Sequence, residues 1–560
     1  MSVDSGVNPV SARTGDTFID YSALRALVVE DYPGMRNALR LSLTNLGITR
    51  VQLAANAAEA IFQVKQKPDD FILCDFNLGD GRDGQQLLEE LRHSHLISLE
   101  TVFMMVTAES YYEKVVATAE LAPDDYMIKP FSPEVLRSRL ESILLRKRAF
   151  SDVYLHFHAQ ELNAAIAACD TLIQDKPKYL VDALRFKGEL LVTLGRPEEA
   201  EALYQQVIAM RAIPWARLGL ARALHLQAKD DAAEEELRGV MEQAPEMVAA
   251  YDLLSDVCLA RKDAHAAQEA LEQGVAISAR TVRRQQKLGE IAHTNGDLET
   301  ARSAFANVLE KGLHSVFVTP SDFGNLCRVQ LEQGDVQGAA ATLKKNKTTL
   351  QASPEGQLVM AVTQGMVQIR SGNLKDAAKA VEDAMALRAG GTRGDAGLLL
   401  DMAGACMASG RHDEADGIVA EVARNAHDSE HLLARARKLY DDAGRRDAGT
   451  AVLAAATADV RKLNNEGVVL AHRGDFRTAV DKLLTACAEA PHNPRIMMNA
   501  VWVMLKFIDQ AGMDEQMIEI ARRHRDEAER QAPGHARIAG LRLHLKNVES
   551  KFGIQRKATA

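Results

Sequence analysis

The sequence predicts an α/β domain with a doubly wound, five-stranded parallel sheet, followed by an all-α repeat solenoid. Three observations predict this organisation. Near the start of the chain, short apolar runs alternate with helix-like segments. From Tyr154 onward the chain is rich in Ala, Leu, Glu, Gln and Arg and has few strand-like runs, which favours helices. A turn signal then recurs at spacings of 30 to 38 residues.

Polar residues follow directly after four apolar runs of the first domain. The runs and their polar ends are Ala26–Val29 with Glu30 and Asp31, Phe71–Cys74 with Asp75, Phe103–Val106 with Thr107, and Tyr126–Ile128 with Lys129. Because the functional crevice of a parallel sheet lies outside the carboxyl ends of its strands, we expect these side chains to share one site. Three carboxylates held close repel one another unless a hard cation such as Mg²⁺ lies among them. The set predicts phosphoryl transfer to Asp75, with Lys129 and the metal neutralising charge on the phosphoryl oxygens.

From about Arg25 to Arg146 the chain resembles response-regulator receiver domains, which have a flavodoxin-like fold. The resemblance assigns roles position by position. It implies a phosphoacceptor at Asp75, metal-binding acids at Glu30, Asp31 and Asp75, a backbone carbonyl to the metal from Asn77, a switch pair at Thr107 and Tyr126, catalytic roles for Lys129 and Thr107, and a cis peptide bond between Lys129 and Pro130. The implied cofactor is Mg²⁺.

The loop after Asp75 departs from the common receiver pattern. Residues 78–83 replace the usual methionine-proline turn and are one residue longer, which leaves the kinetics of phosphorylation open. Asn77 together with Glu109 resembles the pairing in chemotaxis-type regulators that lose phosphate quickly. We therefore expect a short-lived phosphate.

The same loop reads G-x-G-x-x-G from Gly79 to Gly84, which is the pattern of a dinucleotide site. A pyrophosphate bound there would face the carboxylates of Asp75, Asp80 and Asp83. Because like charges repel, the sequence disfavours a nucleotide at this loop.

For Asp75 and the residues around it, an alternative to the phosphate site stays open: an ordinary sheet edge with capping acids, or a degenerate receiver that takes no phosphate.

From about residue 150 to residue 490 the chain resembles tetratricopeptide repeats, whose period is about 34 residues. A turn signal followed five residues later by a small residue stands at Gly195, Gly296, Gly334, Gly372, Gly410 and Gly474, with weaker copies at Gln160, Ala228, Lys262 and Gly444. Small residues where two helices must approach closely stand at Gly188, Ala221, Ser255, Gly289, Gly365, Ala403 and Gly467. Prolines that stop the second helix stand at Pro177, Pro245 and Pro491.

The repeats are least regular between Arg280 and Leu463. Spacings are longer there, and extra residues such as Ala389–Thr392 interrupt the pattern. Insertions in a solenoid usually lie on one face, and that face often binds a partner. We favour the alternative interpretation that these insertions are tolerated loops, because added loop length costs little free energy.

We predict four parts of the chain. They are a disordered tail at 1–22, a receiver domain at 23–148, a repeat solenoid at 149–493, and a further helical pair with a capping helix and a frayed end at 494–560, with Gly512 as a turn. No Gly or Pro occurs from Glu134 to Lys176. The last receiver helix is therefore expected to pass almost directly into the first repeat helix and to transmit a rotation.

Composition favours a cytoplasmic protein. The first twenty residues are polar, so neither a signal peptide nor a membrane-spanning segment is expected. Six scattered cysteines are typical of reduced core residues. The net charge of −10 argues against a nucleic-acid surface, and the basic segment Arg283–Lys287 is interpreted as a solvated helix face.

The predicted function is that of a bacterial two-component response regulator. A histidine kinase or phosphotransfer protein is expected to phosphorylate Asp75, and the repeats are expected to bind an unidentified protein partner in a phosphorylation-dependent way. Apart from the receiver's own phosphoryl transfer and dephosphorylation, we expect no enzyme activity. The alternatives are a phosphate-independent scaffold with a degenerate receiver, and transcriptional control through direct binding of DNA or of a regulator. Self-association into a homodimer is also left open.

Overall fold

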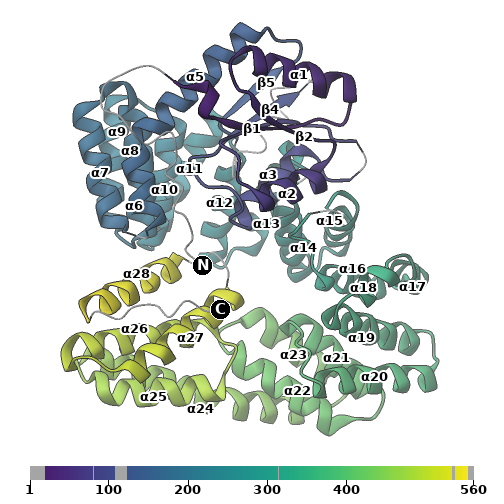
Figure 1. The fold of residues 1–560 in the computed structure, drawn as a ribbon. Helices are drawn as coiled ribbons and strands as arrows, with labels where there is room; N and C mark the ends of the chain where they lie inside the picture. Colours follow the sequence, from purple (N-terminus) through teal and green to yellow (C-terminus); the bar gives the residue numbers. More distant parts are fainter. Residues whose placement is uncertain are drawn as a thin grey trace. The chain divides into compact units, whose positions relative to one another are not determined.

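The computed structural model describes residues 19–79, 81–107, 123–159, 161–279, 281–312, 315–532 and 536–552. Within them, a parallel sheet near the N-terminus is followed by a long series of helices (Figure 1), which confirms the predicted fold class. Asp80, Glu109, Gln160 and Arg280 lie outside the described residues, as does most of the predicted N-terminal tail. The chain forms two compact units, of which the first comprises residues 1–192, 196–288 and 310–318, and the second comprises residues 193–195, 289–309 and 319–560.

The sheet has the order β2-β1-β3-β4-β5, and every neighbouring pair is parallel. Its strands are β1 (Arg25–Val29), β2 (Arg50–Ala54), β3 (Phe71–Asp75), β4 (Val102–Thr107) and β5 (Asp125–Ile128). Both β3 and β4 are buried along their whole length. Strands covered on both faces need apolar residues at successive positions, which explains their continuous apolar runs.

Helices cover both faces of the sheet (Figure 1), and a hydrophobic core lies on each face. The helices α1 (Pro33–Asn45) and α5 (Pro133–Ala149) contribute buried leucines to one core. The other core is formed with α2 (Ala57–Gln66) and α3 (Gly84–His93). Ile19 and Tyr21 pack against the first core, and η1 (Tyr21–Ala23) precedes β1. The folded part therefore begins before residue 23, within the segment predicted as a disordered tail.

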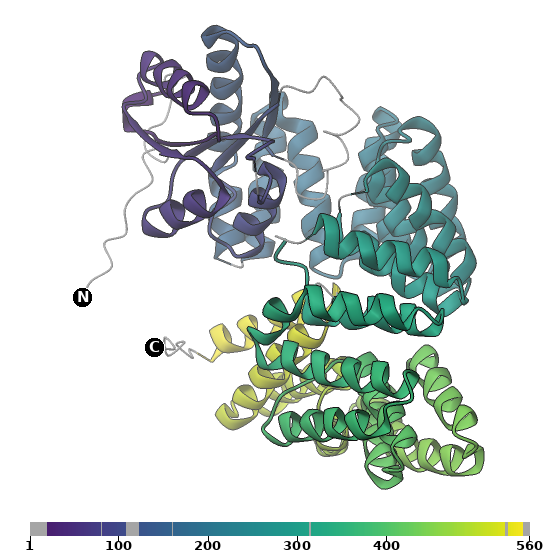
Figure 2. The ribbon, with the colours of Figure 1, turned by 90° about the vertical axis from the view of Figure 1, so that its right-hand side faces the viewer.

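The remaining helices form successive antiparallel hairpins, visible from two directions in Figures 1 and 2. From the sheet to the end of unit 1 they are α6 (Ser151–His158), α7 (Leu162–Asp175), η3 (Pro177–Tyr179), α8 (Leu180–Thr193), α9 (Pro197–Met210), α10 (Pro214–Leu226), α11 (Asp230–Gln243), α12 (Val248–Ala260) and α13 (Ala264–Ile277). The division between the units falls within α14 (Val282–Asn295) and α15 (Leu298–Lys311), and Thr193 at the end of α8 belongs to unit 2. Those of unit 2 are α16 (Pro320–Glu332), α17 (Val336–Lys345), α18 (Lys347–Gln351), α19 (Pro354–Arg370), α20 (Leu374–Ala389), α21 (Ala396–Ala408), α22 (His412–Asn425), α23 (Glu430–Asp442), α24 (Arg446–His472), α25 (Phe476–Glu489), α26 (Pro494–Ala511), α27 (Glu515–Gln531) and α28 (Ala536–Lys551).

The predicted repeat turns have a common backbone conformation. All six glycines of the strong signals, from Gly195 to Gly474, have positive φ angles, as does Gly444. Two weaker copies share it without glycine, since φ is +57° at Ala228 and +64° at Lys262. Positive φ is rare for residues with a side chain, so its occurrence at both positions confirms that the turn is part of the repeat.

Close helix packing explains the small residues that precede each turn. All seven predicted positions are buried. A Cβ atom added at Gly188 would lie 2.5 Å from Tyr204, and one at Gly289 would lie 2.7 Å from Phe305. The three predicted prolines each follow the end of a helix, namely α7, α11 and α25. At the C-terminal end, α26 and α27 form a further pair around Gly512 (φ +100°), and α28 follows it.

The cysteines and the basic segment differ in outcome. All six cysteines are buried and free, which confirms their interpretation as core residues. The interpretation of Arg283–Lys287 as a solvated face is wrong at its centre, because Arg284 is 4% and Gln285 2% exposed. The guanidinium of Arg284 lies 2.6 Å from Asp252 on α12, an ion pair that the local sequence does not reveal.

Candidate functional site

Three carboxylates meet at the carboxyl ends of β1 and β3. One oxygen from each of Glu30, Asp31 and Asp75 lies within 4.8 Å of the others. Glu30 is buried, Asp75 is 9% exposed, and Asp31 is exposed to solvent. The cluster is therefore accessible from the Asp31 side. An all-oxygen set of this size fits Mg²⁺, which takes few carboxylates and completes its shell with water and phosphoryl oxygens.

Lys129 joins two of these carboxylates. Its Nζ lies 2.7 Å from Glu30 Oε2 and 3.0 Å from Asp75 Oδ2. The backbone N–H of Lys129 donates to the Thr107 carbonyl at 2.8 Å, and this bond holds the lysine beside the end of β4. The peptide bond between Lys129 and Pro130 is cis, as predicted.

Burial and charge pairing have opposite effects on the pKa of each charged group in this cluster. Burial raises the pKa of Glu30 and that of Asp75, and the hydrogen bonds from Lys129 oppose the rise. Burial lowers the pKa of Lys129, but the hydrogen bonds to both carboxylates outweigh it and raise that pKa. Lys129 therefore supplies the positive charge that two buried carboxylates need.

Two of the three glycines of the G-x-G-x-x-G loop, Gly79 and Gly84, allow close packing around the acids, whereas Gly81 has a positive φ of +117°. A Cβ atom added at Gly79, where φ is +73°, would lie 3.1 Å from Asp31 Oδ2. One added at Gly84 would lie 2.3 Å from the carbonyl oxygen of Asp75. Asp83 forms a capping box with Gln86 at the start of α3. The pattern is thus explained by the approach of the loop to the carboxylates and by helix capping, without a nucleotide.

The other predicted site residues surround the cluster. Thr107 ends β4 and is 4% exposed. Tyr126 is partly buried in β5 and packs against the core formed with α2 and α3. Asn77 is exposed, and its Oδ1 accepts a hydrogen bond from the N–H of Gly79 at 3.3 Å. The chemical roles of all these residues stay predictions.

One residue separates the last helix of the sheet domain from the first repeat helix. Phe150 is both the C-cap of α5 and the N-cap of α6. Its ring stacks on Tyr154 at a centroid distance of 5.8 Å, and both rings contact Phe186 of α8 edge-on at 6.3 and 5.9 Å. The break between the helices is therefore packed against α8, the first helix of the following hairpin.

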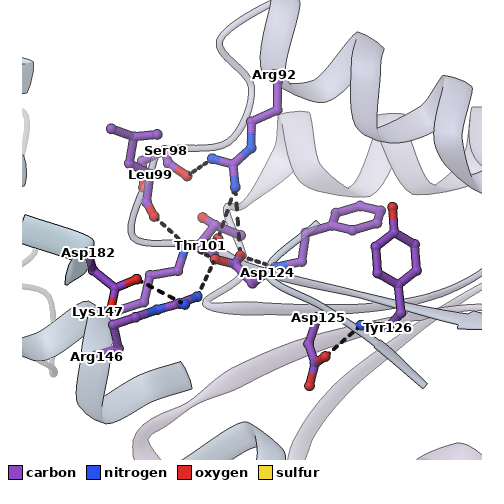
Figure 3. Close-up of polar contacts among 11 residues, drawn as sticks. Arg92, Ser98, Leu99, Thr101, Asp124, Asp125, Tyr126, Arg146, Lys147 and Asp182 are labelled. Carbon is purple, nitrogen blue, oxygen red and sulfur yellow. Dashed lines mark hydrogen bonds and ion pairs between the residues drawn. The ribbon is translucent and has the colours of Figure 1, made fainter. Parts of the chain in front are cut away.

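A polar network surrounds Asp124 beside this junction (Figure 3). Lys147 of α5 lies 2.7 Å from the Asp124 carboxylate, whereas Arg146 and Arg92 lie 3.7 and 3.9 Å away. The N–H of Phe103 donates to the same carboxylate at 2.9 Å. Lys147 is 6% exposed and also donates to the Thr101 carbonyl at 3.2 Å.

The network reaches the repeats through Arg146, whose guanidinium lies 3.8 Å from Asp182 of α8. Sequence reasoning missed this network. Its signals were the basic run Arg146–Arg148 in the last turn of α5 and the acid that precedes β5. Neither signal indicates which residues pair, because the paired side chains come from segments that are distant in the sequence.

Comparisons with known proteins identify two different families in two parts of the chain. Residues 26–141 match the family model of the response regulator receiver domain, and residues 187–248 match that of the tetratricopeptide repeat. The chain is 29% identical over 123 residues to the chemotaxis protein CheY-3 of Vibrio cholerae serotype O1, a match that covers 22% of this chain and 93% of that protein. The chain is also 29% identical to the chemotaxis protein CheY of Pseudomonas aeruginosa, a match that covers 22% of this chain and 98% of that protein.

Two solved structures are similar to separate parts of the chain. The Vibrio cholerae chemotaxis protein CheY4 is 26% identical, with 21% of this chain and 98% of that chain covered and a TM-score of 0.20. The structure of Pseudomonas aeruginosa pilF is 15% identical, with 37% of this chain and 93% of that chain covered and a TM-score of 0.30.

Among the described residues, no helix combines the length and the apolarity needed to cross a bilayer.

Proposed function

We propose that this chain, a response regulator with an N-terminal receiver domain followed by tetratricopeptide repeats, accepts phosphate on Asp75 and thereby controls the binding of a partner protein to the repeats. A histidine kinase or phosphotransfer protein supplies the phosphate, in the cytoplasm. The observation that carries the proposal is the contact of Lys129 with both Asp75 and Glu30 beside Asp31.

The chain's own groups divide the chemistry among them. Asp75 attacks phosphorus through a carboxylate oxygen, so an acyl phosphate P–O bond forms while the P–N bond to the donor histidine breaks. Lys129 and the Thr107 hydroxyl contact the transferred phosphoryl oxygens, and Tyr126 moves inward with Thr107. Glu30, Asp31, Asp75 and the Asn77 carbonyl hold Mg²⁺, which supplies positive charge beside the phosphoryl group when bound.

The signal leaves the receiver domain through α5 and α6. Support comes from Phe150, the single residue between these helices, and from its contact with Phe186 of α8. The Asp124 network adds a second connection, through Arg146 to Asp182. A junction without a flexible linker converts a shift of α5 into a shift of the first repeat helices.

The test adds beryllofluoride and Mg²⁺ to the full chain and measures hydrogen exchange. In wild type, protection is expected to change in the receiver domain and past Phe150 in α6 to α8. Asp75→Asn should abolish both changes. The matched control is Asp83→Asn on the neighbouring loop, which keeps its helix cap because Asn caps as well as Asp. Absence of any change in wild type would overturn the proposal and favour a phosphate-independent scaffold.

A second variant separates the site from the coupling. Insertion of a flexible Gly-Ser segment after Phe150 should leave phosphate uptake from acetyl phosphate intact and abolish the changes in α6 to α8. If those changes persist, the helix junction does not carry the signal. Binding of the full chain to nonspecific duplex DNA that weakens steeply with salt would instead favour a direct role in transcription.

A further inference from the structure

A groove runs along α19 and α20 in unit 2. Its volume is about 1060 Å³, and both helices line it lengthwise. Gln351 of α18 borders it, as do Gly390 and Thr392 of the loop after α20. Every lining residue belongs to one hairpin or to the segments on either side of it.

Both border segments are insertions. The turns at Gly334, Gly372 and Gly410 are spaced by 38 residues, four more than the usual period of about 34. Ahead of α19, the extra length forms α18, which the structure places between α17 and α19. After α20, it forms the loop from Gly390 to Asp395. Because α19 and α20 are antiparallel, the start of α19 and the end of α20 lie at the same end of the hairpin, so both insertions border the groove at that end.

The α19 wall presents carboxamides in a line. Gln357, Gln364 and Gln368 stand seven and four residues apart, so they share one helix face. At 1.5 Å per residue their spacings along the helix are about 10 Å and about 6 Å. Groups on one edge of an extended chain recur every two residues, at about 6.7 Å. Only the spacing of about 6 Å between Gln364 and Gln368 comes near this repeat. Each carboxamide offers a donor and an acceptor, so this pair suits the N–H and C=O groups on one edge of an extended peptide.

The glutamines are partly or wholly available for such contacts. Among the described residues, Gln364 has no hydrogen bond from its side chain, and it is exposed. Gln357 uses only its Nε2, which donates to the Gln351 carbonyl at 3.1 Å. Gln368 uses only its Oε1, which accepts from Asn373 at 3.0 Å.

The α20 wall carries a net negative charge. Asp376, Lys379 and Asp383 are exposed and line the groove, and the structure gives none of the three an ion pair within the part of the chain it describes. Met360 and Leu387 supply apolar surface between the two walls. A basic side chain is attracted to such a wall, and an acidic one is repelled.

We infer that the groove between α19 and α20 binds an extended segment of a partner protein that carries a lysine or an arginine. Gln357 and Gln368 are about 16 Å apart along the helix, which matches about five residues of extended chain. The inference rests on the proposed function, since it names the partner segment that the repeats recognise.

A random peptide library displayed on phage, selected against the full chain, tests the inference. The selected peptides are expected to share a lysine or arginine. One of them, synthesised with a fluorescent label, should lose affinity about tenfold for Asp383→Lys through charge repulsion, and roughly 3- to 10-fold for Gln364→Ala through a lost hydrogen bond. The matched controls are Asp481→Lys on α25 and Gln205→Ala on α9, both exposed and outside the groove. Circular dichroism of each variant verifies that it is folded.

The outcomes separate this inference from the proposed function. Selection of acidic peptides, of none, or of peptides whose affinity is equal for wild type and both groove variants would overturn the groove site. Phosphate uptake on Asp75 is measured in the same preparations with acetyl phosphate. Normal uptake together with a failed selection removes the groove alone, whereas absent uptake with a successful selection removes the phosphorylation control and keeps the groove.

Discussion

Replacement of Asp124 by alanine is the sharpest test of the polar network at the junction. The carboxylate of Asp124 accepts from the N–H of Phe103 and pairs with Lys147, whose Nζ lies 2.7 Å away. Burial lowers the pKa of Lys147, and the charge of Asp124 opposes this shift. Asp124→Ala leaves a lysine that is 6% exposed with backbone carbonyls as its closest partners.

The expected cost follows from the burial of the pair. Removing one partner of a buried ion pair destabilises a protein by about 3–5 kcal/mol, because the other charge stays buried. The control is Asp182→Ala in the same network. Its pair with Arg146 spans 3.8 Å, and the two side chains are 47% and 35% exposed, so the expected cost is about 0–1 kcal/mol.

Hydrogen exchange measured by mass spectrometry gives the local free energy of opening. In Asp124→Ala, amides of β4, β5 and α5 are expected to exchange about 100-fold faster or more, since each 1.4 kcal/mol is a factor of about ten. The double variant Asp124→Ala/Lys147→Met removes both charges and should recover part of the loss. Equal effects of Asp124→Ala and Asp182→Ala would refute the reasoning.

Three further predictions concern the receiver sheet, the repeats and the phosphate site. Burial raises the pKa of Asp69 to about 6, although the positive charge of Arg25 lowers it. Between about pH 4 and 6 the folded state therefore binds more protons than the unfolded state. The free energy of unfolding is then expected to fall as pH rises through this window. Asp69→Asn should flatten that fall, as measured by hydrogen exchange of β1 and β3 corrected for intrinsic rates, and an unchanged profile would contradict it. Ala479→Leu should lower the free energy of unfolding, measured with urea, by about 1–3 kcal/mol, because Ala479 is 0% exposed and a larger side chain overpacks α24 against α25. The control Ala455→Leu, at an exposed position, should change this free energy little. Lys129→Ala should keep Mg²⁺ binding in calorimetry yet abolish the phosphate-induced changes in α6 to α8, and wild-type changes in this variant would speak against a role for the lysine.

Much of the candidate site was predictable because the positions of its residues along the chain, directly after strands, determine where they lie. In a parallel sheet, residues that directly follow the strands reach the same edge, so Glu30, Asp75 and Lys129 had to lie near one another once the strands were recognised. The repeats were predictable for a similar reason. A turn requires positive φ, and close helices require small residues, so Gly372 and Gly188 mark their places without knowledge of distant contacts.

The rest required contacts between segments far apart in the chain. Arg284 looks solvent-exposed in its own segment, and only the neighbouring Asp252 on α12 explains its burial. Lys147 pairs with Asp124, and nothing in either local segment indicates the other.

The sequence by itself determined the class of each part, the residues gathered at the sheet edge and the positions of the repeat turns, because these depend on periodicity and on short-range backbone preference. Only the tertiary structure decided which charges are buried and paired, how tightly Phe150 joins the two helices, and that two separate insertions border one groove between α19 and α20. These features depend on the packing of distant segments, which a linear pattern does not encode.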